Sequence, residues 1–359
     1  MNLVDFEIQA HALLPHLLFS AAFLGILFFA RSKRDLFGFA LIVAFCVTLG
    51  LRDIGGMSRD ADPVLYAFIL SYAGDVSSLL GGVDFAIFSL LHSVTGTFFD
   101  LATCFLFLHL LYVPALYLLY RRLRKFRGVF FLLVGWMIFI NSGLLLLANF
   151  FRQGICILLF LSIFVGICVR AKNNSTDKFG AMGLPLLHMT SAAMIPSLFA
   201  ARKRYYYYVS SSCLVLLCLI VHFAPNAGVF QSSGYFNDAG ADSDAQQSML
   251  WIKILSIYVI LGVGYLLSLQ SKDASAEVKS IQRGAVGLMI PTAALLLTAN
   301  APVVGLRYLY YSYALAFLYL ASVVSCRKGD ALYKWGAVGI CLFGFVTWTY
   351  PTVAVLLIW

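Results

Sequence analysis

Charged side chains stand at unusual places in a long and mostly apolar chain. Arg152 is the only charged residue among the 42 residues from Gly128 to Val169. The planar fork of an arginine matches phosphate oxygens at two points, and a guanidinium inside an apolar run is a candidate functional group. Four further cations fall outside the short basic clusters between the apolar runs: Arg52, Arg59, Lys253 and Arg307. Several such groups at one membrane depth would suit a lipid-linked pyrophosphate.

His188 adds a group that could move a proton. An imidazole with both ring nitrogens accessible can act as a general base near neutral pH. Arg152 and Arg307 also open helices, where unpaired N–H groups and the helix dipole favour an anion. Other interpretations stay open. Each arginine could instead reach to a lipid phosphate or pair with an outer aspartate, and His188 could bond a backbone carbonyl inside a packed core.

The elements that must position these groups are membrane-spanning helices. The chain has 359 residues, of which 62% are hydrophobic and 11% charged, whereas a soluble globular chain carries about 25% charged residues. The net charge of +9 does not indicate nucleic acid, because the basic residues form short clusters typical of cytoplasmic loops. Runs of the length that a span requires predict about ten transmembrane helices. They cover 10–30, 36–51, 98–120, 128–149, 154–170, 205–223, 250–269, 284–300, 306–325 and 334–357.

Placing every basic cluster in the cytoplasm sets the orientation, with both termini outside. The run 128–169 would then be about 63 Å of helix at 1.5 Å per residue. That is two crossings of a roughly 30 Å hydrocarbon core. Arg152 lies near the middle of the run, so we expect it at the turn on the outer side.

The segment 179–201, "FGAMGLPLLHMTSAAMIPSLFAA", decides the second half of the topology. As one span it divides the lysines and arginines into 13 inside and 12 outside. As a re-entrant pair that turns near His188 it divides them into 20 inside and 5 outside, which the positive-inside rule favours. Pro185 and Pro196 flank the tip and suit broken half-helices. The alternative is a single span with a proline kink.

Two outer segments, 52–97 and 224–249, are long. The first contains two apolar stretches too short to span, which suit interfacial helices. The second is acidic and rich in glycine and serine, as loops are. No linker separates domains, so we expect a single transmembrane domain over 1–359.

Four segments together resemble the Wzy-type repeat-unit polymerases of bacterial O-antigens and exopolysaccharides, in their EpsG-like branch. "NFFRQGICILLF" resembles the family segment N-x-x-R-Q-G/S-x-A, and "LRDIGGMSRDADPVLYAFI" resembles its first outer loop. "LLHMTSAAMIPSLF" resembles H-x-S-A-x-x-x-x-P, and "GLRYLYYSYAL" resembles the late R-x-x-Y-F segment. The order matches the family. The first loop lacks a compact Gly-Thr-Asp, which leaves the roles of Asp60 and Asp62 open.

The resemblance implies a metal-independent glycosyltransferase of the GT-C type in the bacterial inner membrane, with its active site facing the periplasm. It would join undecaprenyl-pyrophosphate-linked glycans without a cofactor, among membrane lipids and beside a flippase and a chain-length regulator. His188 would take the acceptor proton, and Arg152 would assist catalysis. The implied pyrophosphate ligands are Arg152, Arg307, Arg52 and Arg59. The implied sugar contacts are Asp60, Asp62, Tyr66 and Tyr311.

Two other functions stay open. An O-antigen ligase uses the same donor, but the outer loops are small for docking a lipid A core. A lipid-linked oligosaccharide flippase or an ion-coupled carrier would place charges near the bilayer midplane. The predicted spans hold almost no acids, and Asp100, just inside a span, is the one residue that favours a transporter.

Overall fold

The structure is a computed structural model, and every regular element that it describes is a helix. The described residues are 3–52, 62–71, 100–126, 128–148, 150–169, 175–195, 198, 204–223, 243–269, 275–298, 302–326 and 330–349. They divide into two compact units. Unit 1 comprises Met1–Ser162 and Gly329–Trp359, and unit 2 comprises Ile163–Lys328. The all-helical prediction is confirmed for this part of the chain.

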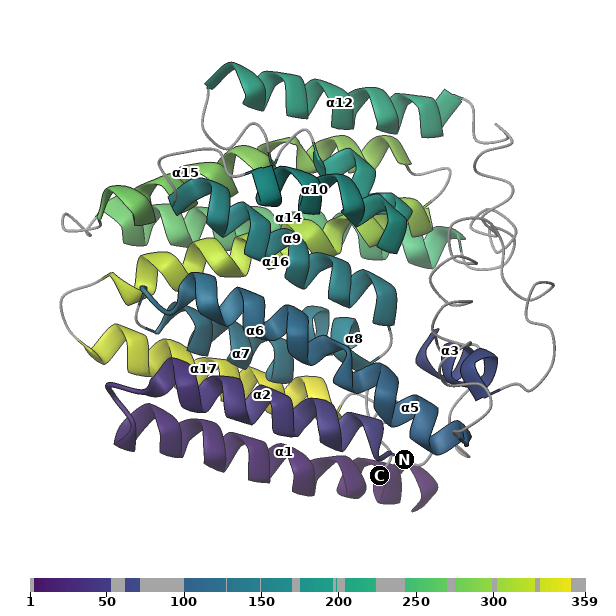
Figure 1. The fold of residues 1–359 in the computed structure, drawn as a ribbon, viewed down its shortest axis with the longest axis vertical. Coiled ribbons are helices and arrows are strands. Elements are labelled where there is room, and N and C mark those ends of the chain that lie inside the picture. Colours follow the sequence, from purple (N-terminus) through teal and green to yellow (C-terminus); the bar gives the residue numbers. More distant parts are fainter. Residues whose placement is uncertain are drawn as a thin grey trace. The chain divides into compact units, whose positions relative to one another are not determined.

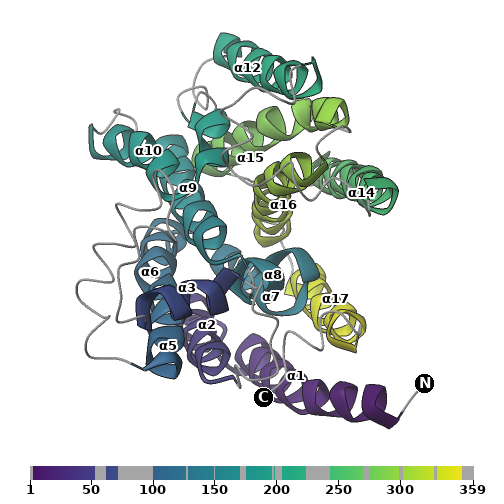
Figure 2. The same cartoon turned by 90° about the vertical axis from the view of Figure 1, so that its right-hand side faces the viewer.

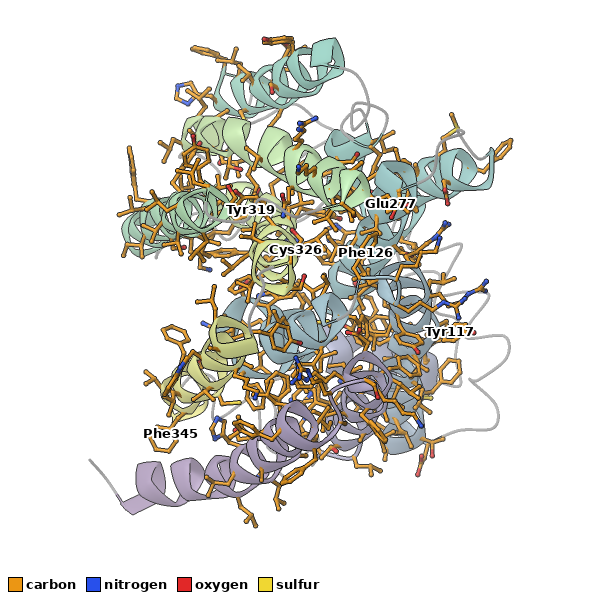
Figure 3. The ribbon with its side chains drawn as sticks, turned by 90° about the vertical axis from the view of Figure 1, so that its left-hand side faces the viewer. Tyr117, Phe126, Glu277, Tyr319, Cys326 and Phe345 are labelled. Carbon is orange, nitrogen blue, oxygen red and sulfur yellow. The ribbon has the colours of Figure 1, made fainter. Side chains whose placement is uncertain are left out.

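Unit 1 contains nine helices among its described residues, the last of which comes from the far end of the chain. They are α1 (Leu3–Phe29), α2 (Arg34–Gly50), α3 (Asp62–Ser71), α5 (Leu101–Leu110), α6 (Tyr112–Leu123), α7 (Val129–Phe139), α8 (Asn141–Ala148), the first part of α9 (Phe151–Val169) and α17 (Asp330–Thr349). Figure 1 shows yellow α17 beside purple α1, and α17 also packs on α7. Phe345 of α17, labelled in Figure 3, contacts the buried His16 ring edge-on at 5.9 Å.

A cluster of polar side chains links four helices at one end of unit 1. Arg34 donates from Nε and Nη2 to the Leu27 carbonyl, at 3.0 and 2.7 Å, and its Cζ lies 4.9 Å from the centre of the Tyr333 ring. Asp35 accepts hydrogen bonds from the backbone amides of Gly128 and Phe131, both at 2.9 Å. These bonds satisfy amides at the start of α7 that have no partner within the helix. The cluster joins α1, α2, α7 and α17 where the sequence places the cytoplasm.

The predicted span 128–149 is not one straight helix. Helices α7 and α8 meet at 76° across Ile140, whose backbone is extended. The Trp136 indole donates to Ser142 across the bend at 2.9 Å. A side chain at Gly143 would collide with the backbone of Trp136 and Met137, so the bend requires glycine there. The run therefore forms either a broken span or a re-entrant loop.

Unit 2 contains the rest of α9, α10 (Ser175–Leu187), the 3-10 helix η1 (Met189–Met194), α12 (Arg204–Phe223), α14 (Ser243–Leu269), α15 (Ala276–Met289), η2 (Ile290–Thr298) and α16 (Pro302–Ser325). Figure 2 shows α14 and α15 flanking α16, which has the largest buried share of the candidate spans. Tyr319 of α16, labelled in Figure 3, packs closely on Gly264 of α14. Thr292 of η2 and Ser312 of α16 share a hydrogen bond of 3.0 Å.

The described helices support a polytopic membrane protein. Five are long and apolar enough to cross a bilayer, or six if the bent α7–α8 pair counts as one span. The five are Leu101–Leu123, Phe151–Val169, Leu250–Leu269, Ala276–Thr298 and Gly305–Ser325, and each overlaps a predicted span. The predicted span 10–30 contains the shorter apolar helix Leu14–Phe29, and the predicted span 334–357 overlaps the shorter apolar helix Ala331–Thr347. Helix α2 covers the predicted span 36–51 up to Gly50, and α12 covers the predicted span 205–223.

Candidate functional site

Arg152 lies at the start of α9 and faces an aromatic ring from α3. Its Cζ is 5.0 Å from the centroid of the Tyr66 ring, within the range of a cation–π contact. Tyr66 is 5% exposed, and its ring is also 6.3 Å from that of Phe151. Two of the predicted site residues, Arg152 and Tyr66, are therefore brought together within unit 1.

The connection from α8 to α9 is held by Tyr112, which lies at the start of α6. The Tyr112 hydroxyl donates to the carbonyl oxygens of Leu146, at 2.6 Å, and Phe151, at 3.2 Å. Gly154 approaches the same place, since a Cβ there would come within 2.8 Å of the Tyr112 hydroxyl and would also collide with the Leu146 carbonyl. Packing alone therefore explains the glycine at the end of "NFFRQG", without any contact to a substrate.

Arg52 is buried, with 3% of its surface exposed. Its Nε donates to the Leu49 carbonyl at 2.8 Å, and its Nη2 donates to the Ala148 carbonyl at 3.3 Å. The second bond joins the end of α2 to Ala148 at the end of α8, three residues before the first residue of α9. The structure therefore places Arg52, which is distant in sequence, close in space to the start of the element that carries Arg152, with its guanidinium bonded to backbone oxygens.

His109 also lies beside Arg52. Its Nδ1 is 2.9 Å from the Phe105 carbonyl, which can only accept, so Nδ1 carries the proton. The other nitrogen, Nε2, is then an acceptor and lies 3.5 Å from Nη2 of Arg52. A neutral histidine with this tautomer suits a neighbouring guanidinium, since it presents a lone pair to the cation.

His188 lies at a break in unit 2. It follows the last residue of α10 and precedes η1, with an extended backbone at φ −156° and ψ 118°. Its amide donates to the Leu184 carbonyl and its carbonyl accepts from the Ser191 amide, both at 3.0 Å. The side chain is 5% exposed. The helix thus breaks at the residue where the sequence predicts the tip of a re-entrant pair, while the path of the chain across the membrane stays a prediction.

Arg307 and Tyr311 both lie on α16 in unit 2. Arg307 is partly exposed, and Tyr311 is fully buried. One turn from Arg307, the Tyr310 ring has the Lys253 ammonium 5.6 Å from its centroid. Lys253 and Arg307, two of the five predicted outer cations, thus lie near one aromatic side chain. Convergence of Arg307 and His188 with Arg152, which belongs to unit 1, stays a prediction.

Several predicted site residues lie outside the described part of the chain. Arg59 and Asp60 do, as does most of the outer segments 52–97 and 224–249. Asp62 is the first residue of α3. The proposed roles of these three residues stay predictions.

Sequence reasoning missed His109 and Tyr112. Both lie in the predicted span 98–120, and their spacing of three residues puts them on one helical face. A polar face inside an apolar run is the signal that would have singled them out. Asp100, by contrast, does not lie inside a helix. It is an exposed N-cap that accepts a 2.8 Å bond from the Thr103 amide, which gives this acid a structural role at the start of α5.

Among the described residues, no group of three or more histidines, cysteines, aspartates and glutamates could hold a metal ion. At the start of α9, the group suited to an anion is the guanidinium of Arg152, which lies over the Tyr66 ring. Comparison with family models, with curated proteins and with solved structures finds no match for this chain.

Proposed function

We propose that this protein polymerises undecaprenyl-pyrophosphate-linked oligosaccharide repeat units at the outer face of the bacterial inner membrane. The observation that carries the proposal is the contact between Arg152 and Tyr66. The two residues come from separate segments, each of which resembles a segment of the same polymerase family. Arg52, from the same segment as Tyr66, also bonds Ala148 beside the Arg152 segment. Segments singled out for one function thus meet in space.

The reaction would join two lipid-linked glycans. The terminal hydroxyl oxygen of the acceptor bonds the anomeric carbon of the donor, and the bond from that carbon to the pyrophosphate oxygen breaks. The electron pair stays on the pyrophosphate, which leaves on its lipid. Arg152 and Arg307, with Arg52 or Arg59, would stabilise the growing negative charge, and His188 would accept the hydroxyl proton. Asp60, Asp62, Tyr66 and Tyr311 remain the proposed sugar contacts.

The proposed fold is GT-C-like, with about ten spans and a re-entrant pair over 179–201. The helix break at His188 supports the re-entrant pair, because a half-helix that ends at the tip needs such a break. Cysteines introduced one at a time at Arg202, Lys203 and Arg204 test it. Labelling from the cytoplasmic side is expected, and labelling from the periplasmic side would exclude the hairpin.

Purified protein tests the activity directly. We expect it to lengthen a lipid-linked repeat unit with no ATP or ion gradient, which a carrier would not do. Arg152→Lys keeps the charge but loses the two-point fork. Since a charged hydrogen bond contributes about 1.5–3 kcal/mol, polymer formation should fall roughly 10- to 100-fold. Arg124→Lys, at an exposed arginine after α6, is the matched control. Full-length polymer from Arg152→Ala at normal expression would remove the pyrophosphate role.

His188 is tested separately by the pH dependence of the rate. A general base is worth about 10²–10⁴-fold, so His188→Ala should give a folded but slow enzyme. His188→Gln keeps a hydrogen-bonding group and cannot accept the proton. A rate for His188→Gln like that of the wild type would exclude His188 as the base and turn attention to Asp60 and Asp62.

A further inference from the structure

We propose that Arg52 and Tyr112 are positioning residues that hold the α8–α9 connection, and through it the guanidinium of Arg152, in a fixed place. The inference rests on the proposed function only for its catalytic consequence. The structural part of the proposal is that two side chains bond the α8–α9 connection. Arg52, at the end of α2, and Tyr112, at the start of α6, each donate a hydrogen bond to a carbonyl at the end of α8.

The carbonyl groups of the last turn of α8 carry the argument. The last four carbonyls of a helix have no partner inside the helix. In α8 the Leu145 carbonyl accepts from the Phe150 amide at 2.9 Å, and the Leu146 carbonyl accepts from the Tyr112 hydroxyl at 2.6 Å. The Ala148 carbonyl accepts from Arg52. Side chains distant in sequence therefore bond two of these four carbonyls.

Tyr112 reaches both sides of the connection. Its hydroxyl also lies 3.2 Å from the Phe151 carbonyl, and its ring meets the Phe151 ring edge-on at 5.6 Å. Phe151 precedes Arg152 directly, so a shift of this residue moves the guanidinium. Misplacement by about 1 Å can cost a reaction about 100-fold, which makes the order of this connection matter for catalysis.

The side chain of Arg52 is itself held in place by other contacts. Its Nε donates to the Leu49 carbonyl of α2 at 2.8 Å, and its Nη2 faces the acceptor nitrogen of His109. A cation at the C-terminus of α8 also complements the helix dipole. These contacts indicate that Arg52 holds the end of α8 in place and does not bind substrate phosphate directly. Direct binding predicts that loss of Arg52 adds to loss of Arg152, whereas positioning predicts that it does not.

Hydrogen exchange of the detergent-solubilised full chain tests the tie without any activity assay. Tyr112→Phe removes the hydroxyl and keeps the ring. We expect faster exchange at the Phe150 and Gly154 amides, whose bonds to Leu145 and Phe150 lie in the connection. Arg52→Gln should do the same. Tyr117→Phe, at an exposed tyrosine of the same helix, should change nothing there. Unchanged exchange in Tyr112→Phe, or an equal rise throughout unit 1, would overturn the proposal.

A double-mutant cycle in the polymerisation assay tests the catalytic consequence. Tyr112→Phe should slow the wild type about tenfold at saturating substrate and leave the residual rate of Arg152→Ala unchanged. An equal slowing in both backgrounds, or none in the wild type, would show that Tyr112 does not act through Arg152. If the wild type makes no polymer, the proposed function fails, and the exchange experiment alone decides whether the connection is held as described.

Discussion

The guanidinium of Arg152 lies over the ring of Tyr66, with Cζ 5.0 Å from the ring centroid. The Tyr66 ring is almost completely buried, so its neighbours in the core restrict its movement and it can hold the guanidinium in place. This geometry suggests a role for Tyr66 besides the predicted sugar contact. The aromatic face can hold the guanidinium at one orientation while its N–H groups, which lie in the plane of the fork, remain directed toward a ligand.

The two roles of Tyr66 predict different substitutions. If the ring supports Arg152, Tyr66→Phe should keep most of the polymerisation rate, and Tyr66→Leu should lower kcat/KM about 2- to 30-fold, equivalent to a cation–π energy of about 0.5–2 kcal/mol. If the hydroxyl contacts a sugar, Tyr66→Phe should already raise KM. Steady-state kinetics of the two variants on a lipid-linked repeat unit separate them.

Gly154 should tolerate no side chain. A Cβ would meet the Leu146 carbonyl and the Tyr112 hydroxyl, and the carbonyl is backbone that cannot rotate away. Gly154→Ala is therefore expected to lower stability by about 1–3 kcal/mol, the usual cost of overpacking, with a lower thermal midpoint in detergent. Gly183→Ala, in a helix with open space around the added methyl group, is the control. Equal midpoints for the two variants would contradict this packing.

Gly128 should be equally restrictive for another reason. Its φ is +86°, where a side chain costs about 1–2 kcal/mol, and a Cβ would lie 2.7 Å from the Tyr333 hydroxyl. That hydroxyl donates to the Gly128 carbonyl at 2.9 Å. We expect Gly128→Ala to lower the free energy of unfolding by more than 2 kcal/mol, roughly the sum of strain and a lost buried bond. Gly339→Ala, in α17 with nothing within 4 Å, should be neutral or slightly stabilising.

Asp100 should make stability depend on acid pH. Hydrogen bonds from the Thr103 side chain and amide hold the pKa of its carboxyl below the ordinary 3.8. Its stabilising contribution is complete above that ordinary value and is lost as the pH falls through the lowered pKa. Asn also caps helices but does not titrate. The advantage in thermal midpoint of the wild type over Asp100→Asn should therefore shrink between about pH 5 and pH 3.

Helix positions followed from the sequence because apolar runs of about 20 residues and basic clusters mark spans and their ends. The bend in 128–149 did not, although its signal was present. "NSG" at Asn141–Gly143 is a turn sequence, and the apolar residues around it concealed it. The burial of Arg52 could not be predicted, since its acceptors are backbone oxygens of Leu49 and Ala148 that any sequence supplies. Only the folded chain brings the second one within reach.

Helix α17 is synthesised well after the other described helices of unit 1. It packs on α1 and α7, and Tyr333 bonds Gly128, which leaves the ribosome 205 residues earlier. At about 5–20 residues per second, some 10–40 s separate the two residues. During that interval the faces of α1 and α7 that α17 will cover are without their partner helix. Synthesis of α17, and not that of the first helices, is thus the event that completes this part of the packing of unit 1.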